Sequence, residues 1–380
     1  MQEITREVLV SRARELMAEG KVDRILGWSA GEYGYDVTPA VFQSMDEMEK
    51  RFVWNSFCGA NFSKYLVGET KKEGKVLVFL KPCDSYSFNQ LLTEHRFDRE
   101  KVYAVGVPCG GMLDVGKVRE KAEGISEVRE EEDRVCIETM YDGSLSVDRT
   151  ELLPDRCLHC KSRKHVAYDE LLGEDGEITD NSRFDEVEQI EAMSPDERFA
   201  FWQGELSRCI RCNACRDVCP ACTCEKCVFD NPASGVENKA AANSFEEQMF
   251  HIIRAFHVAG RCTDCGECSR VCPQHIPLHL LNRKFIKDIN SFYGEYQAGA
   301  EVGSRAPVVN YTTQDLEPGV AVERGSSHAY DCVGSAESAV CGDCGTVFPV
   351  SAGGYQSGGA VPAVAGGRTA LRGAEHGSES

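Results

Sequence analysis

One cysteine pattern occurs twice in this sequence. Residues 209–220 read CIRCNACRDVCP, and residues 262–273 read CTDCGECSRVCP. In both runs, two residues separate the first three cysteines, three residues separate the third from the fourth, and a proline follows. Because short gaps let three thiolates surround one face of a small cluster, this spacing is typical of ligands of a cubane 4Fe-4S cluster.

The two runs predict two clusters that exchange their fourth ligands, as in two-cluster bacterial ferredoxins. We expect one cluster on Cys209, Cys212, Cys215 and Cys272, and the other on Cys262, Cys265, Cys268 and Cys219. We also expect a helix to begin at the proline after each fourth cysteine. A pair of zinc knuckles is the alternative, but it explains two runs of four cysteines poorly.

Helix signals surround the two motifs. Ser194-Pro195-Asp196-Glu197 and Ser244-Phe245-Glu246-Glu247 both read as capping boxes, and a third helix is expected after Pro277. A long helix therefore lies between motifs that start 53 residues apart. In this respect residues 194–292 resemble the helical ferredoxin module of the iron–sulfur subunits of succinate dehydrogenase and heterodisulfide reductase.

Three more cysteines follow the first motif closely, in the run Cys222-Thr-Cys224-Glu-Lys-Cys227. They are candidates to ligate a further cluster or to replace an expected ligand, and the alternative is a set of reduced, sequestered thiols. His275 and His279 lie four residues apart after the second motif. A solvated or packed helix face is a more common reason for that spacing than metal binding.

The N-terminal part shows strand–helix–strand units. Val76–Leu80 reads VLVFL, a buried parallel strand, and Val102–Gly106 reads VYAVG, the next one. Between them, Asp84 is the expected N-cap of a helix that runs through Leu92. Parallel strands bring the following loops to one sheet edge, where open α/β folds bind ligands, and those loops hold Cys83 and Cys109.

A third metal site is predicted from thiols at this edge. Cys157 and Cys160 could join Cys83 and Cys109 around one ion or cluster. A third cubane cluster, a zinc ion and a set of bare thiols all remain open, since four thiolates suit zinc equally well.

The stretches KPCDSYSFNQLL (81–92), GVPCGGM (106–112) and RCLHCKSRKHVAYDELLGE (156–174) carry a second resemblance. They are similar to the N-terminal region of the beta subunits of formate dehydrogenase and deazaflavin-reducing hydrogenase, over about residues 50–175. Members of that family bind an iron–sulfur cluster, and many bind a flavin that passes hydride to a deazaflavin. The resemblance implies FAD as a further cofactor, and Gly110 and Gly111 are candidates for its phosphate turn. The full dinucleotide fingerprint is absent.

Composition agrees with metal chemistry in a reducing compartment. Among 380 residues, 61 acidic and 42 basic side chains give a net charge of −19, which argues against nucleic acid and anionic membranes as partners. No apolar run approaches the ~20 residues of a membrane span, and the charged N-terminus lacks a signal peptide, so a cytoplasmic protein is expected. Twenty cysteines in such a protein read as metal ligands rather than disulfides.

The expected architecture has three parts. Residues 1–185 form an α/β domain with parallel strands, residues 194–292 an all-α helical ferredoxin domain, and residues 295–380 an extended, disordered Gly/Ser-rich tail. In that tail, Cys341 and Cys344 are spaced like half of a zinc knuckle.

The leading hypothesis is an electron-transfer subunit of an anaerobic oxidoreductase, with no catalytic residue of its own. The resemblances imply two partners, a catalytic formate dehydrogenase or hydrogenase subunit and a heterodisulfide-reductase-type flavoprotein. The first alternative is a flavin-dependent subunit that reduces a deazaflavin coenzyme. The second is a zinc-stabilised scaffold without redox chemistry.

Overall fold

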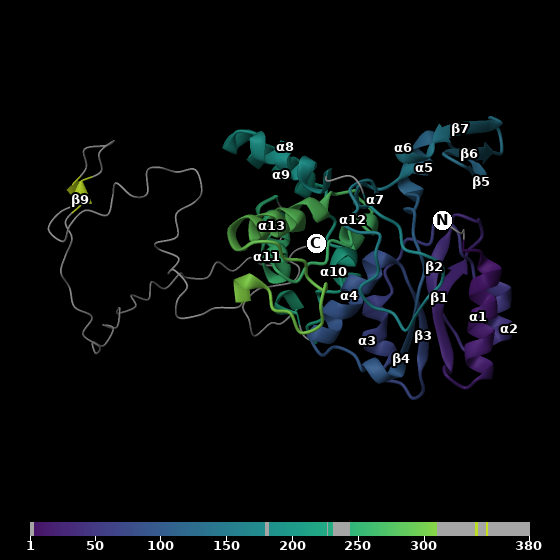
Figure 1. Ribbon diagram of the computed structural model, residues 1–380. Coiled ribbons are helices and arrows are strands. Elements are labelled where there is room, and N and C mark those ends of the chain that lie inside the picture. The colour runs from purple at the N-terminus through teal and green to yellow at the C-terminus, as the bar shows by residue number, and fades with distance from the viewer. Residues whose placement is uncertain are drawn as a thin grey trace, which may run out of the picture. The chain divides into compact units, whose positions relative to one another are not determined.

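The computed structural model describes residues 4–178, 182–225, 227–230 and 244–309, and two short strands farther along the chain (Figure 1). Met1–Tyr311 form one compact unit, and Thr312–Ser380 form a second. In the second unit, β9 (Ala339–Val340) pairs antiparallel with β10 (Val347–Phe348). Cys341 and Cys344 lie outside the described residues.

A five-stranded mixed sheet forms the core of the N-terminal part. Its order is β2 (Val37–Phe42), β1 (Arg24–Ala30), β3 (Val76–Leu80), β4 (Val102–Gly106) and β8 (Glu170–Leu171). The predicted parallel strands are confirmed, with Val76 opposite Val102 and Leu80 opposite Gly106. The sheet is mixed, because residues 31–36 are too short a connection for a crossover and make β1 and β2 an antiparallel hairpin.

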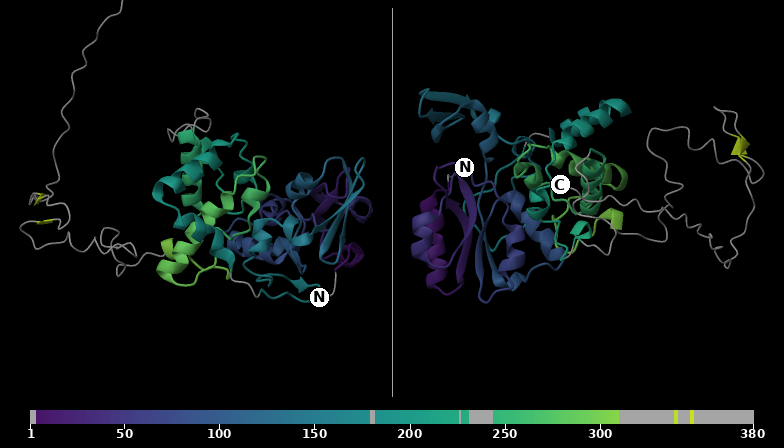
Figure 2. Two further views of the ribbon diagram at one scale, coloured as in Figure 1. Left: turned by 90° about the horizontal axis from the view of Figure 1, so that it is seen from above. Right: turned by 180° about the vertical axis from the view of Figure 1, so that it is seen from behind.

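Helices cover both faces of this sheet (Figures 1 and 2). On one side lie α1 (Arg6–Ala18) and α2 (Met45–Arg51), and on the other lie α3 (Leu66–Glu69) and α4 (Pro82–Thr93). Every residue of β3 is buried, which is the pattern of a strand covered on both faces.

The N-cap of helix α4 lies three residues earlier than predicted. Its N-cap is Lys81, and Pro82 occupies the first turn, a position that its fixed φ and missing N–H suit. Asp84 is therefore not the N-cap; its carboxylate accepts a hydrogen bond from the backbone N–H of Lys81 at 3.2 Å. The consequence for the site is that Cys83 lies in the first turn of α4 rather than in a loop, while Cys109 does lie in the loop after β4.

A small antiparallel sheet with its own apolar core projects from the first unit. It consists of β5 (Ile125–Glu131), β6 (Arg134–Thr139) and β7 (Ser144–Asp148). Three short helices flank it: α5 (Val115–Lys121), α6 (Arg149–Leu152) and α7 (Asp155–Leu158). Val118, Val135 and Leu152 belong to the core that these elements share. Helix α7 is important for the site because it carries Cys157.

The described residues between 182 and 309 form helices and loops without a strand. The α-helices are α8 (Asp185–Ala192), α9 (Pro195–Ser207), α10 (Ala214–Asp217), α11 (Ser244–Val258), α12 (Glu267–Arg270) and α13 (Leu278–Tyr293). The 3-10 helices among the described residues are η1 (Ser63–Tyr65), η2 (Arg99–Lys101), η3 (Ser182–Phe184), η4 (Val228–Asp230) and η6 (Pro307–Val309). The three long helices of this region, α9, α11 and α13, begin where the sequence predicts. The capping box of α9 is present, with the Glu197 backbone N–H donating to Ser194 Oγ at 3.3 Å. Whether residues 1–185 and 194–292 are separate domains stays a prediction.

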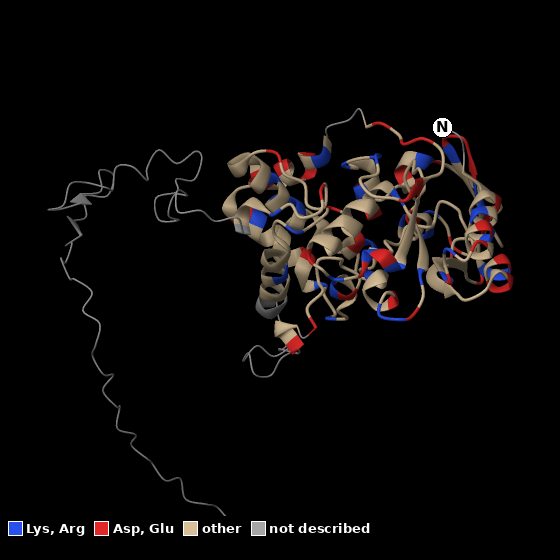
Figure 3. Ribbon diagram, turned by 60° about the horizontal axis from the view of Figure 1, so that its bottom comes forward, with Lys and Arg blue, Asp and Glu red and all other residues tan. Residues whose placement is uncertain are grey.

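The helical region and the sheet region are joined by polar contacts. Ser87 on α4 hydrogen-bonds Thr263 at 2.8 Å, and Arg261 pairs with Glu94 at 2.6 Å. Figure 3 shows acidic and basic positions interspersed along the ribbon. Residues 295–309, at the start of the predicted tail, are also packed: Tyr296 Oη donates to the carbonyl of Gly260 at 3.0 Å. Among the described residues, no helix is long and apolar enough to cross a membrane.

Candidate metal centres

The two cysteine motifs have the same backbone path. In the first, Arg211 and Asn213 adopt left-handed φ values of 54° and 62°; in the second, Asp264 and Gly266 do so at the equivalent positions, with φ of 55° and 66°. A four-residue helix, α10 or α12, follows in each and carries the third cysteine. The predicted helix at the proline after each fourth cysteine is wrong: the described residues continue as turns there, and α13 begins only at Leu278.

These left-handed turns direct backbone N–H groups toward sulfur. Arg211 N–H lies 3.4 Å from Cys209 Sγ. Such successive turns form the concave, N–H-lined surfaces that bind anionic groups and iron–sulfur clusters.

The first thiol group lies around one cavity in the helical region. Its cysteines are Cys209, Cys212, Cys215 and Cys272. The fourth member comes from the second motif, which is the grouping expected for exchanged ligands. Burial raises the pKa of Cys215 to about 11, whereas Cys212 is exposed at the surface. This group therefore adjoins solvent on one side.

The second thiol group is more deeply placed. Cys265 and Cys268 are buried, and burial raises the pKa of each thiol to about 12. The Cys219 sulfur is near enough to Cys262, Cys265 and Cys268 to raise their pKa values further. Without a metal, Cys262, Cys265 and Cys268 are therefore neutral, and metal binding has to displace their protons.

A buried guanidinium lies between these two groups. Arg254 on α11 is 4% exposed, and its Nη2 donates to the carbonyl of Cys215 at 2.8 Å. The thiols of Cys215, Cys219 and Cys268 face it and favour its charged form. A buried cation beside eight thiols fits a site that carries net negative charge when the thiolates hold clusters.

The third predicted site is also brought together by the fold. Cys83, Cys109, Cys157 and Cys160 line one cavity, from α4, the loop after β4, α7 and the segment after α7. Burial raises the pKa of Cys109 to about 11 and that of Cys83 well above its usual value. Lys81 is buried at this cavity, where its Nζ pairs with Asp84 at 2.8 Å.

The third cavity adjoins the second thiol group. Cys265 lines the cavity along with the four thiols. Arg156 also lines it and bridges the two sites: Nη1 donates to the carbonyl of Cys265 at 2.8 Å and to Glu267 Oε1 at 2.5 Å. Arg156 and Arg270 hold the pKa of the buried Glu267 carboxyl down to about 2.

The three cysteines after the first motif form a separate surface. Cys222, Cys224 and Cys227 line one cavity, among several basic side chains. Of these, Arg254 and Arg261 lie near the Cys222 thiol. The structure brings the three thiols to one cavity, but it provides no fourth cysteine among that cavity's lining residues.

Gly110 and Gly111, the candidates for a flavin turn, line another cavity beside Cys109. Arg149, Trp54 and Glu130 also line it. Arg149 Nη2 donates to the carbonyl of Gly111 at 2.8 Å, and Gly111 has a φ of 108°, which a side chain would strain.

Two charged residues beside the thiols, Arg254 and Arg156, were missed by sequence reasoning. Arg254 lies in a buried column on α11 with Phe250 and Val258, so an arginine at a helix position that is otherwise apolar is the signal that could have found it. For Arg156 no comparable signal exists, because its contacts with Cys265 and Glu267 span more than 100 residues of sequence.

Comparison with known proteins supports iron–sulfur binding. A model of the 4Fe-4S dicluster domain matches residues 205–276. The F420-dependent formate dehydrogenase subunit beta of Methanocaldococcus jannaschii is 24% identical over 331 residues, covering 72% of this chain and 86% of the relative. The F420-dependent formate dehydrogenase 1 subunit beta of Methanococcus maripaludis is 23% identical, covering 56% and 71%.

Among solved structures, a chain of the F420-reducing [NiFe] hydrogenase complex of Methanosarcina barkeri aligns with a TM-score of 0.33 and 13% identity, covering 53% of this chain and 86% of that one. The sequence comparisons confirm the resemblance drawn from the cysteine-bearing stretches. The chain is therefore an iron–sulfur protein similar to the beta subunits of F420-dependent formate dehydrogenase.

Proposed function

We propose that the chain is an electron-transfer subunit with three 4Fe-4S clusters in a row. The order is the third thiol group, then the second, then the first. The observation that carries this proposal is the position of Cys265, which belongs to the second group and also lines the third cavity. The first and second groups are linked in turn because Cys219 and Cys272 each lie with the cysteines of the other motif.

The protein's own residues hold the clusters and balance their charge. When bound, cubane clusters supply one-electron transfer. Each thiolate quartet brings four negative charges, and the buried Lys81 and Arg254, together with the partly buried Arg156, are placed to offset them. The exposed Cys212 puts the first group at the surface, which suits exchange of electrons with another protein.

The partners in this proposal follow from the relatives. They are a catalytic formate dehydrogenase or hydrogenase subunit and a heterodisulfide-reductase-type flavoprotein. Residues 194–292 then serve as a helical ferredoxin module, which the helices and loops of that region support.

Iron quantitation with electron paramagnetic resonance of the reduced protein tests the proposal. We expect about twelve irons per chain and spin coupling between neighbouring clusters, since each cubane has four irons. About eight irons together with one zinc bound by sulfur ligands would assign zinc to the third site and remove the third cluster from the relay. A colourless zinc protein would exclude electron transfer.

A second candidate function is flavin-dependent reduction of a deazaflavin coenzyme. The cavity lined by Gly110, Gly111 and Arg149 favours it, because that cavity also reaches Cys109 of the third group. In this case FAD would bind there and receive electrons from the clusters. Reconstitution with FAD followed by an assay of deazaflavin reduction tests it. If the protein retains no flavin, only the electron-transfer function remains as the proposal.

A further inference from the structure

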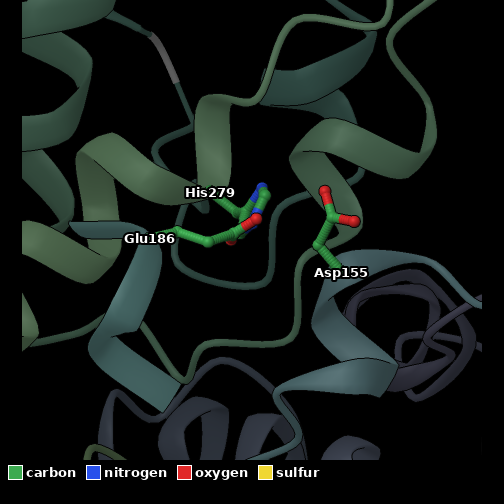
Figure 4. A group of neighbouring side chains, drawn as sticks. All are labelled: Asp155, Glu186 and His279. Atoms are coloured by element: carbon green, nitrogen blue, oxygen red, sulfur yellow. The ribbon is translucent and has the colours of Figure 1, made fainter. Parts of the chain in front are cut away.

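Three side chains outside the thiol groups converge at the junction of three helices. Asp155 begins α7, Glu186 lies in the first turn of α8, and His279 lies in the first turn of α13 (Figure 4). One ligand atom from each lies within 4.8 Å of the other two. Asp155 and His279 also line a cavity that the thiol groups do not share.

The histidine is oriented as a metal ligand would be. His279 is 4% exposed, and its Nδ1 lies 2.9 Å from Ser269 Oγ, which also accepts the His279 backbone N–H at 3.0 Å. This contact fixes the ring and leaves Nε2 facing Glu186. A ligating imidazole usually has its other nitrogen held by such a hydrogen bond.

The facing atoms are buried and have no hydrogen bond. His279 Nε2 and Glu186 Oε2 are both inaccessible to solvent and without a hydrogen-bond partner in the described part of the chain. They lie 3.8 Å apart, which is too long for a direct hydrogen bond. Two ligand atoms that share one ion, with bonds of about 2.1 Å, lie roughly 3–3.5 Å apart. A small movement would therefore accommodate an ion.

Asp155 is the most accessible of the three. One of its oxygens, Oδ1, pairs with Lys117 Nζ at 3.1 Å, and that ammonium also donates to the carbonyl of Leu153 at 2.8 Å. A carboxylate has a second oxygen with free lone pairs, so the lysine and an ion can share Asp155.

We propose that Asp155, Glu186 and His279 bind one divalent transition-metal ion of the zinc type, separate from the iron–sulfur clusters. One imidazole and two carboxylates form a donor set that suits such ions, and thiolate is not among the ligands. The ion would join α7, α8 and α13. Asp155 lies two residues before Cys157 and His279 lies seven after Cys272, so the ion would connect the third thiol group to the first.

Metal analysis of the full-length, iron-loaded protein incubated with Zn²⁺ and then desalted tests this proposal. We expect one zinc per chain in the wild type and in His275→Gln, a control residue that lines the same cavity but is exposed. His279→Gln and Glu186→Gln are expected to lose that zinc and keep their iron.

Zinc X-ray absorption of the wild type gives a second readout that needs no variant to fold. We expect nitrogen and oxygen ligands only. Sulfur ligation would place the zinc at a thiol group and overturn the proposal. Absence of retained zinc in the wild type would also overturn it, and would leave His279 and Glu186 as a direct ion pair. Since the iron content is measured in the same samples, failure here is distinguishable from failure of the relay.

Discussion

The first two thiol groups and the third differ in how the chain builds them. Three members of each of the first two groups come from one stretch of seven residues, such as Cys209 to Cys215, and the backbone turns within that stretch place them. The third group draws on positions 83, 109, 157 and 160, which only the sheet topology and α7 bring together. Local spacing is enough to specify the first kind of site, whereas the second kind exists only in the folded domain.

The largest effect is expected from breaking the ligand exchange. Cys219→Ser should abolish the same paramagnetic signal as Cys262→Ser, and Cys272→Ser the same signal as Cys209→Ser, because each fourth cysteine lies with the other motif. Each change should cost up to four irons per chain. Iron quantitation and electron paramagnetic resonance of the four variants give the pairing.

Cys222→Ser is the matched control for this pairing, since Cys222 lies three residues after Cys219 and its backbone N–H donates to the Cys219 carbonyl at 3.0 Å. Its clusters should stay intact. If Cys222→Ser removes a cluster and Cys219→Ser does not, the ligand assignment is wrong.

The second-largest effect is expected from substitutions in the third thiol group, which test whether this group binds a cluster. Cys83→Ser or Cys157→Ser should lower the iron content by about four per chain and leave the signals of the other two clusters unchanged. Cys136→Ser is the control, because that thiol lies in β6 and lines neither this cavity nor that of the first group. Equal iron in all three variants would remove the third cluster from the relay.

An intermediate effect is expected from the charge between the first two groups. Arg254→Gln should lower the reduction potentials of both clusters, because a buried positive charge favours the reduced, more negative state. For a unit charge at about 7 Å and an effective dielectric constant of about 20, the shift is on the order of 100 mV.

Arg254→Lys keeps the charge and serves as the control in a redox titration followed by electron paramagnetic resonance. Its potentials should stay close to those of the wild type. A third cluster, which Arg254 does not contact, should also keep its potential. Equal shifts in both variants would show that packing, rather than charge, accounts for the change.

The sequence predicted the features that depend on near neighbours. The strands Val76–Leu80 and Val102–Gly106, the capping box at Ser194 and the helix after Pro277 are all confirmed. The misses came from competing local signals and from long-range contacts. At α4, Pro82 determined the helix start and Asp84 did not. Arg156 was missed because no local pattern links it to Cys265.

The smallest effect is expected where the second cysteine motif contacts Arg156 of the third site. Gly266 in the second motif and Asn213 in the first have nearly the same left-handed φ, but a Cβ at Gly266 would lie 2.6 Å from the Arg156 side chain. Gly266→Ala should therefore lower the free energy of unfolding by about 1–3 kcal/mol, since it adds both backbone strain and a close contact.

Asn213→Gly relieves strain at the equivalent position and should change stability by less than about 1 kcal/mol. Thermal unfolding of both variants, in the cluster-loaded state, measures the difference. If the two substitutions cost the same, the contact between Arg156 and the second motif contributes nothing. If only Gly266→Ala is destabilising, the glycine is needed for its left-handed φ and for the close approach of Arg156 together.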